Sequence, residues 1–232
     1  MKDRYGQAGE KIDEIVAEMQ RLGVWQGEPP PPEKMRFSKA FAMDTLSFEQ
    51  WLQFVLVPRV RGIIDERGEF PEESSLGDKA NREYLMWGGD PGFERMVELL
   101  FELDSLIHLF RMKVRDFYLF EADSNPPPFG SRPARASRFP RETTRFVYWE
   151  LVLDFPVLFR RVPLDIEAVY CHGGGNLLAR QTLQSGIEAG WTWSHHFFSW
   201  GWNDPGRWEP GPYTLELFVW DEKIAAASFE VF

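Results

Sequence analysis

The chain has 232 residues, a formal net charge of −10, and 20 Phe, 10 Trp, 6 Tyr and one Cys. So many aromatic residues exclude a disordered chain, and the acidity argues against general binding to nucleic-acid phosphates. One cysteine excludes an internal disulfide and a zinc site built from several cysteines. No apolar stretch follows the first residues and no run of 18 apolar residues occurs. We therefore expect no signal peptide, no membrane span and a cytoplasmic location.

The first half of the chain has the pattern of helices. Apolar residues at three- and four-residue steps predict a helix over residues 7–22, which Gly23 ends. The run Pro29–Pro32 cannot be helical, because proline lacks the backbone donor. Ser47, followed three residues later by Gln50, matches a capping box and predicts the start of a second helix.

Three further signals divide the rest of this half. Pro58 falls inside the pattern of the second helix and predicts a kink or break there. A shorter helix is expected over residues 76–87. Asp90 and Pro91 are a typical N-cap and first helical residue, and the helix that they start buries apolar residues as far as Ile107.

Residues 111–145 are different in character, with 8 Lys and Arg against 4 acidic residues. A proline-rich stretch at about 122–144 reads as a basic connector. Its cations suit RNA phosphates, but they also suit ion pairs with the helical half, which carries 13 basic and 21 acidic residues. We favour ion pairing.

The remaining sequence has the pattern of strands. Apolar and polar residues alternate in short runs separated by turn signals, and together with residues 114–121 they give about seven strands. This predicts an antiparallel, immunoglobulin-like β-sandwich. We therefore predict an α+β chain of two domains, a helical bundle over residues 1–110 and a β-sandwich over residues 111–232 that includes the connector.

The helical half also carries a resemblance. Leu22-Gly23-Val24-Trp25, Phe41, the stretch from Asp44 to Phe54, and Pro58-Arg59 resemble the YqcC-like family of small helical bacterial proteins, over about residues 10–107. The resemblance implies a compact helical bundle without an established enzymatic activity. Because members are often encoded beside a tRNA pseudouridine synthase, it also implies an association with tRNA modification. It does not extend to the β half, which is only generically similar to small bacterial β-sandwich modules.

A dense polar and aromatic group lies within this stretch. One interpretation makes it a recognition surface for a partner protein, and the other makes it helix caps, a kink and core packing, which these residue types commonly form. We favour the second interpretation. The group comprises Asp44, Gln50, Trp51, Gln53 and Arg59.

The β half contains a long aromatic segment that is a candidate ligand surface for sugars or bases. Side chains alternate across a strand, so Trp191, Trp193 and His195 are expected on one face, with Trp200 and Trp202 on the other unless a bulge near Gly201 moves them. The favoured alternative is that one face is sandwich core and the other meets the helical half. The candidate residues are Trp191, Trp193, His195, Trp200, Trp202 and Trp208.

Metal binding and catalysis have little support. Cys171 and His172, like His195 and His196, are neighbours on a strand and point in opposite directions, so neither pair chelates easily. Ser194 beside His195 does not establish a catalytic pair, and no nucleophile-elbow motif occurs. We expect no metal, no cofactor and no catalytic residues.

These observations favour a non-enzymatic interaction or adaptor protein with an unidentified protein partner and an association with tRNA modification. Direct binding of nucleic acid or of a membrane is not expected. The alternative is a module that binds a small ligand of carbohydrate type through the Trp-rich segment. An enzyme is the third hypothesis, motivated only by Ser194, His195 and His196.

Overall fold

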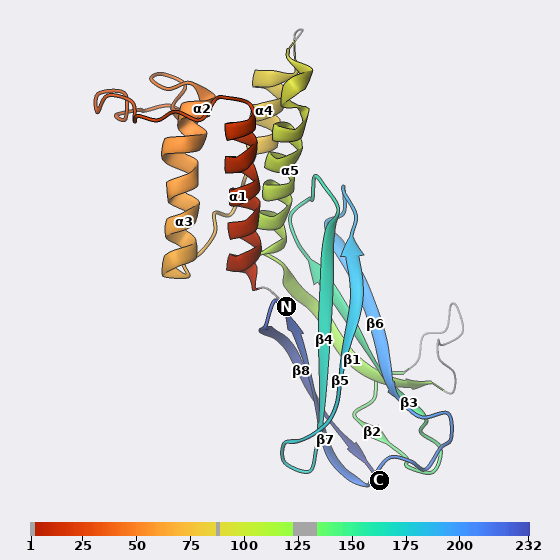
Figure 1. The fold of residues 1–232 in the computed structure, drawn as a ribbon. Helices are drawn as coiled ribbons and strands as arrows, with labels where there is room; N and C mark the ends of the chain where they lie inside the picture. The colour runs from red at the N-terminus through yellow and green to blue at the C-terminus, as the bar shows by residue number, and fades with distance from the viewer. Residues whose placement is uncertain (1–2, 87–88, 123–133) are drawn as a thin grey trace.

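A computed structural model describes residues 3–86, 89–122 and 134–232. Helices occupy the first part and strands the second, and the two parts meet end to end (Figure 1). No described helix is both long and apolar enough to cross a membrane. The helices are α1 (Arg4–Arg21), α2 (Phe48–Trp51), α3 (Val57–Glu66), α4 (Leu76–Tyr84) and α5 (Glu94–Leu109).

The first helix begins and ends at local signals in the sequence. Asp3 caps α1 by accepting a hydrogen bond from the amide of Gly6 at 2.8 Å. Gly23 adopts a positive φ of 72°, which glycine reaches without strain, and ends the helix as predicted. Between these caps Ile12, Ile15 and Met19 are fully buried against the other helices.

The second helix continues through Pro58 without a break. The capping box of Ser47 and Gln50 starts α2, and the helix passes through a π-helical turn at Leu52–Leu56 directly into α3, with Pro58 in its first turn. A π turn contains one extra residue, and here the Val57 amide donates to the Leu52 carbonyl five residues earlier. The wider turn thus accommodates the proline that the sequence predicted would interrupt the helix.

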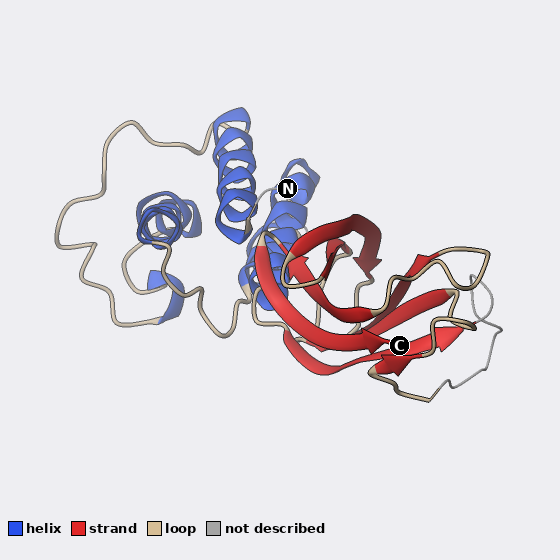
Figure 2. Cartoon of the chain, turned by 90° about the horizontal axis from the view of Figure 1, so that it is seen from below, coloured by secondary structure: helices blue, strands red, loops and turns tan. Residues whose placement is uncertain are grey.

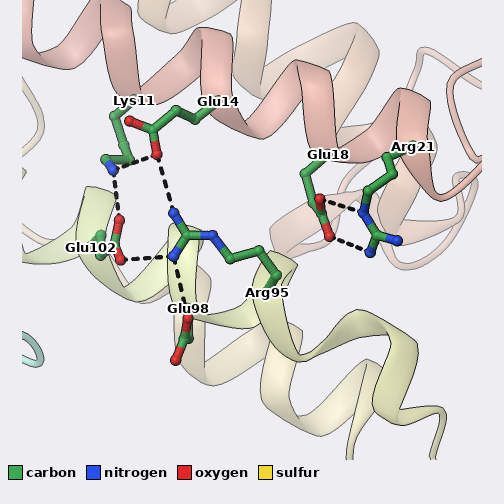
Figure 3. Close-up of polar contacts among 7 residues, drawn as sticks. All are labelled: Lys11, Glu14, Glu18, Arg21, Arg95, Glu98 and Glu102. Carbon is green, nitrogen blue, oxygen red and sulfur yellow. Dashed lines mark hydrogen bonds and ion pairs between the residues drawn. The ribbon is translucent and has the colours of Figure 1, made fainter.

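Charged side chains connect α1 to α5 along one side of the bundle (Figure 3). Lys11 contacts Glu102 at 2.6 Å, and Arg95 contacts both Glu102 at 3.1 Å and Glu14 at 3.3 Å. Partial burial raises the pKa of Glu102, but Lys11 and Arg95 lower it below the ordinary value. These pairs therefore offset the charges of Glu14 and Glu102 where α1 packs on α5.

The β part has two sheets that form an immunoglobulin-like sandwich. One sheet has the order β1-β3-β6 and the other β2-β8-β7-β4-β5, with β2 parallel to β8 and all other pairs antiparallel. This confirms the predicted fold class, because two largely antiparallel sheets packed on one another form a β-sandwich. The strands are β1 (Lys113–Ala122), β2 (Arg138–Phe139), β3 (Phe146–Asp154), β4 (Val162–His172), β5 (Asn176–Ile187), β6 (Trp193–Gly201), β7 (Gly211–Val219) and β8 (Glu222–Val231).

The last helix holds α4 through a buried carboxylate. Asp104 is fully buried and accepts hydrogen bonds from the Ser74 hydroxyl and from the amides of Leu76, at 3.0 Å, and Gly77, at 2.8 Å. These amides are free because they open α4, so the carboxylate caps that helix from a distance. Gly77 is required here, since a Cβ at this position would lie 2.2 Å from the Phe101 ring.

One turn of α5 also holds the sandwich. The Ser105 hydroxyl donates to the Phe101 carbonyl and accepts from the amides of Phe159 and Arg160 in the loop between β3 and β4. The His108 ring contacts the Val157 carbonyl of the same loop through Nδ1 at 2.7 Å, and its Nε2 lies 3.3 Å from the Ser74 amide. With its N–H on Nδ1, this ring donates to one part and accepts from the other.

The turn between β7 and β8 completes the junction. Trp220 packs edge-on against Phe110 at 5.0 Å, and Glu222 pairs with Arg4 at the start of α1. Seen from below, the helices lie to one side of the sandwich and do not cover a sheet (Figure 2). The contacts between the parts are therefore made by loops at one end of the sandwich.

The basic connector falls partly outside the described residues, which omit 123–133. Three of the described cations around it pair with acids of the β part, Arg115 with Asp154, Arg135 with Asp116 and Arg138 with Glu230. Arg111 instead pairs with Glu72 of the helical part. The expected pairing with the helical half thus occurs at Arg111, and the β part supplies the other partners.

Replacing Asp104 with alanine is expected to destabilise the protein by about 3 kcal/mol, because two buried amides and the half-buried Ser74 hydroxyl lose their acceptor. Denaturant unfolding measures this loss. The control is Asp13→Ala, which removes an exposed carboxylate paired with Arg61 and is expected to change stability by less than about 1 kcal/mol. Equal losses in the two variants would contradict the role given to Asp104.

Candidate binding surfaces

A long loop over residues 26–46 projects from the helical part. The buried side-chain amide of Gln53 fixes its first residue, Gln26. The Gln53 side chain accepts from the Gln26 amide at 2.8 Å and donates to the Gln26 carbonyl at 2.7 Å. Gln50, which also completes the capping box of α2, donates to the Gln26 side chain at 3.2 Å. The π turn that carries Gln53 thereby positions the start of this loop.

The far end of loop 26–46 is fixed by a carboxylate and by aromatic packing. Asp44 accepts from the Ser38 amide and hydroxyl, and the first of these bonds is the main reason that its pKa is lowered. The Phe41 ring packs against Trp51 at 4.9 Å. Phe41 and Ala42 both have positive φ, 55° and 51°, a strained conformation for residues other than glycine.

The predicted partner group is therefore mainly scaffold. Asp44, Gln50 and Gln53 make the local hydrogen bonds just described, and Trp51 is half-buried, as the favoured interpretation expects. Arg59 is exposed and lies apart from these bonds on α3. Sequence reasoning found the residues that hold the loop but did not single out what the loop presents.

What loop 26–46 presents is a set of exposed apolar side chains with three cations among them, on a loop whose three acids balance that charge. The Met35, Phe37 and Met43 side chains are 37%, 38% and 57% exposed. Among the residues that the structure describes, the nearby cations Lys34, Arg36 and Lys39 have no ion-pair partner. Exposed apolar side chains beside free cations, on an otherwise acidic part, are typical of an interaction site.

The Trp-rich segment divides into two groups instead of forming one surface. Trp208 is fully buried, with its ring 5.0 Å from Trp200 and 5.4 Å from Trp202, and its indole donates to the Arg145 carbonyl. The pairing of β3 with β6 contains no bulge that would move Trp200 to the other face. The prediction of a shared ligand surface is therefore wrong for Trp208, and Trp200 and Trp202 are half-buried against the sandwich core.

The second group lies on the outer face of the β1-β3-β6 sheet, which we call the aromatic face. Trp193 and Phe197 of β6 are 52% and 43% exposed, and His195 lies between them. The His195 ring is 3.2 Å from Glu150 on β3. No helix covers this face (Figure 2), contrary to the favoured alternative. Beyond the strand, Trp191 and Trp193 line a hollow of about 460 Å³.

Glu150 is the polar centre of the aromatic face. Partial burial, together with the hydrogen bond to Glu150, raises the pKa of Tyr118 on β1 to about 12. Tyr118 and Phe197 both lie opposite Glu150 in the strand register. The carboxylate therefore lies among a phenol, an imidazole and a phenyl ring.

His196 points into the sandwich and makes the serine contacts that the sequence did not assign. Its Nε2 lies 2.8 Å from the Ser194 hydroxyl and its Nδ1 lies 3.1 Å from the Ser185 hydroxyl of β5. Burial, and to a lesser extent the charge of His195, lowers the pKa of His196 to about 4. The ring is thus neutral at pH 7, and it joins the edges of the two sheets.

The described residues contain no group of three or more His, Cys, Asp or Glu side chains placed to hold a metal ion. His172 stacks on Tyr213 at 4.3 Å and lies 3.5 Å from Glu209.

A hollow of about 860 Å³ lies at the junction of the two parts and was missed by sequence reasoning. Its lining includes His108 and Arg111. Arg111 there is already paired with Glu72.

The sequence comparisons with known proteins concern the helical part. A family model described as tRNA pseudouridine synthase C matches residues 7–106. An uncharacterized protein of Haemophilus influenzae is 30% identical over 70 residues, covering 30% of this chain and 66% of that protein. The uncharacterized protein YqcC of Escherichia coli is 34% identical over 47 residues, covering 20% of this chain and 43% of that protein.

A third relative has an assigned activity. The tRNA pseudouridine synthase C of Pectobacterium carotovorum is 29% identical over 68 residues, which cover 29% of this chain and only 18% of that enzyme. The chain therefore spans less than two thirds of these curated relatives. In class, the protein is a helical bundle joined to an immunoglobulin-like sandwich. Its N-terminal region is YqcC-like, as the sequence motifs indicated.

Acid is expected to weaken the fold through His196. The pKa of this ring is about 4 in the folded chain and near 6.5 when unfolded, so only the unfolded state gains a proton between these values. The contribution of His196 to the free energy of unfolding is complete above pH 6.5. It falls by about 3 kcal/mol as the pH is lowered to 4. Denaturant unfolding from pH 7 to pH 4 measures the loss.

Two neighbouring substitutions make this measurement specific. His196→Gln is expected to remove about 3 kcal/mol from the loss between pH 7 and pH 4. His195→Gln, on the exposed side of the same strand, is expected to retain most of the wild-type loss, because burial is the larger cause of the lowered pKa. The assignment fails if His196→Gln retains the full acid sensitivity.

Proposed function

We propose that this protein is a non-enzymatic interaction or adaptor protein, and that loop 26–46 binds its protein partner. One observation carries the proposal: loop 26–46 is held at both ends yet presents Met35, Phe37 and Met43 to solvent. A loop fixed in one conformation loses less entropy on binding than a flexible one. The strained residues Phe41 and Ala42 support this, since strain persists where surrounding contacts impose it.

The charges of loop 26–46 indicate the kind of partner surface. Lys34, Arg36 and Lys39 are free to pair with carboxylates of a partner, and the apolar side chains beside them supply area to bury. A protein with an apolar patch bordered by acids fits both features. The matches to sequences described as tRNA pseudouridine synthase C support a partner that takes part in tRNA modification.

A role without catalysis is supported by the state of His196. A general base works best with a pKa near the working pH, and a histidine with a pKa of about 4 takes up a proton poorly at pH 7. Its serine partners Ser194 and Ser185 have the geometry of a bridge between the sheets. We therefore assign these contacts to stability.

The test is capture of partners from the native host by the wild-type chain and by the double variant Phe37→Asp with Met43→Asp. We expect a protein, identified by mass spectrometry as a tRNA-modifying enzyme, that wild type retains and the double variant loses, because buried carboxylates oppose apolar contact. The control is Leu177→Asp, which alters an equally exposed apolar residue of the β part and is expected to retain the partner.

Three results would count against the proposal. Recovery of no protein that depends on Phe37 and Met43 would overturn the adaptor function. A dependent partner unrelated to tRNA would overturn only the association with tRNA modification. Retention of purified tRNA by wild type, in the absence of other proteins, would show that loop 26–46 binds nucleic acid directly instead.

A further inference from the structure

We propose that the aromatic face of the β1-β3-β6 sheet binds a neutral saccharide. This inference is independent of loop 26–46, which lies in the other part of the molecule. Trp193 and Phe197 are the exposed rings of β6, and side chains two residues apart on a strand point to the same side. The face therefore presents a row of rings, with His195 between them, on which the apolar side of a sugar ring can pack.

The polar groups of this face match hydroxyl groups. A sugar hydroxyl both donates and accepts, so its site needs donors and acceptors close together. The Glu150 carboxylate supplies an acceptor. It lies 3.2 Å from Nε2 of the His195 ring and is hydrogen-bonded to the Tyr118 phenol. Two arginine–carboxylate pairs extend this pattern on the same face, Arg115 with Asp154 and Arg135 with Asp116.

The existing cations disfavour a cationic ligand. The Arg115 guanidinium lies 5.6 Å from the centre of the Trp193 ring, and that of Arg135 lies 4.1 Å from the centre of the Tyr118 ring. A ring already near one cation is a poor site for a second. The acids Glu150, Asp116 and Asp154 likewise oppose a phosphate-bearing ligand.

The same charges disfavour a protein partner on this face. The centre of a protein interface is normally depleted of charged residues. Here Glu150 is at the centre, between Tyr118 and Phe197 in the register, with Asp116 and Asp154 nearby on the same face. The hollow of about 460 Å³ beside Trp191 and Trp193 is within the size range of small-ligand sites. A neutral polyhydroxylated ring fits these features together.

Titration of the full chain with maltohexaose, cellohexaose and chitohexaose tests the proposal. We expect at least one of these neutral sugars to bind, with a Kd on the order of 1 mM or tighter, measured by NMR. The indole N–H signal of Trp193 is expected to shift on binding, whereas that of the buried Trp208 stays in place. Because this readout uses the wild-type chain, it does not depend on a variant that folds.

Substitutions then assign the binding energy. Trp193→Ala is expected to weaken binding at least about fivefold, whereas Phe232→Ala, at an exposed ring near Arg138 on another strand, leaves it unchanged. Absence of binding by all three sugars would overturn the proposal, as would binding that Trp193→Ala does not weaken. Choline that shifts the Trp193 signal where no sugar does would overturn it in favour of a cation.

Discussion

The arrangement of the whole molecule depends on hydrogen bonds made by one turn of α5. Asp104 holds the start of α4, Ser105 holds two amides of the loop between β3 and β4, and His108 contacts both parts. Each bond contributes only about 1 kcal/mol, but a buried group left without its partner costs more than that. The helical and β parts are therefore joined by polar groups that tolerate few alternative positions.

Because the two parts are joined at one end only, the remaining surface of each part is not covered by the other. Arg4, at the start of α1, pairs with Glu222 of the sandwich, whereas loop 26–46 follows the other end of the same helix. Eighteen helical residues separate these ends by about 27 Å. The loop thus projects away from the sandwich (Figure 1), and no helix covers the aromatic face. One chain can present two separate surfaces in a fixed relation.

Local features of the sequence predicted local structure well. Gly23 and the pair Ser47 and Gln50 mark helix ends through contacts within a few residues, so their roles can be read directly. Alternation along the strands likewise indicated a sandwich. At Pro58 the helix is continuous and a π turn precedes it, which the sequence pattern did not indicate.

Contacts between distant residues could not be predicted in the same way. Asp104 bonds to residues about 30 positions earlier, and nothing near it in the sequence indicates that it caps α4. Alternation placed Trp193 and His195 on one face, but only the paired strands show that Glu150 and Tyr118 join them and that Trp208 does not. The polar group around Gln53 was recognised, although its role in holding Gln26 requires the folded loop.

The central claim is that α5 fixes the helical and β parts as one body. Residual dipolar couplings of backbone amides, measured in α1 and α5 and in the strands β3, β4 and β7, test it most directly. The account predicts that one alignment tensor fits the amides of both parts. Two tensors of different magnitude or orientation would contradict it, because the parts would then move independently despite the contacts of Ser105 and His108.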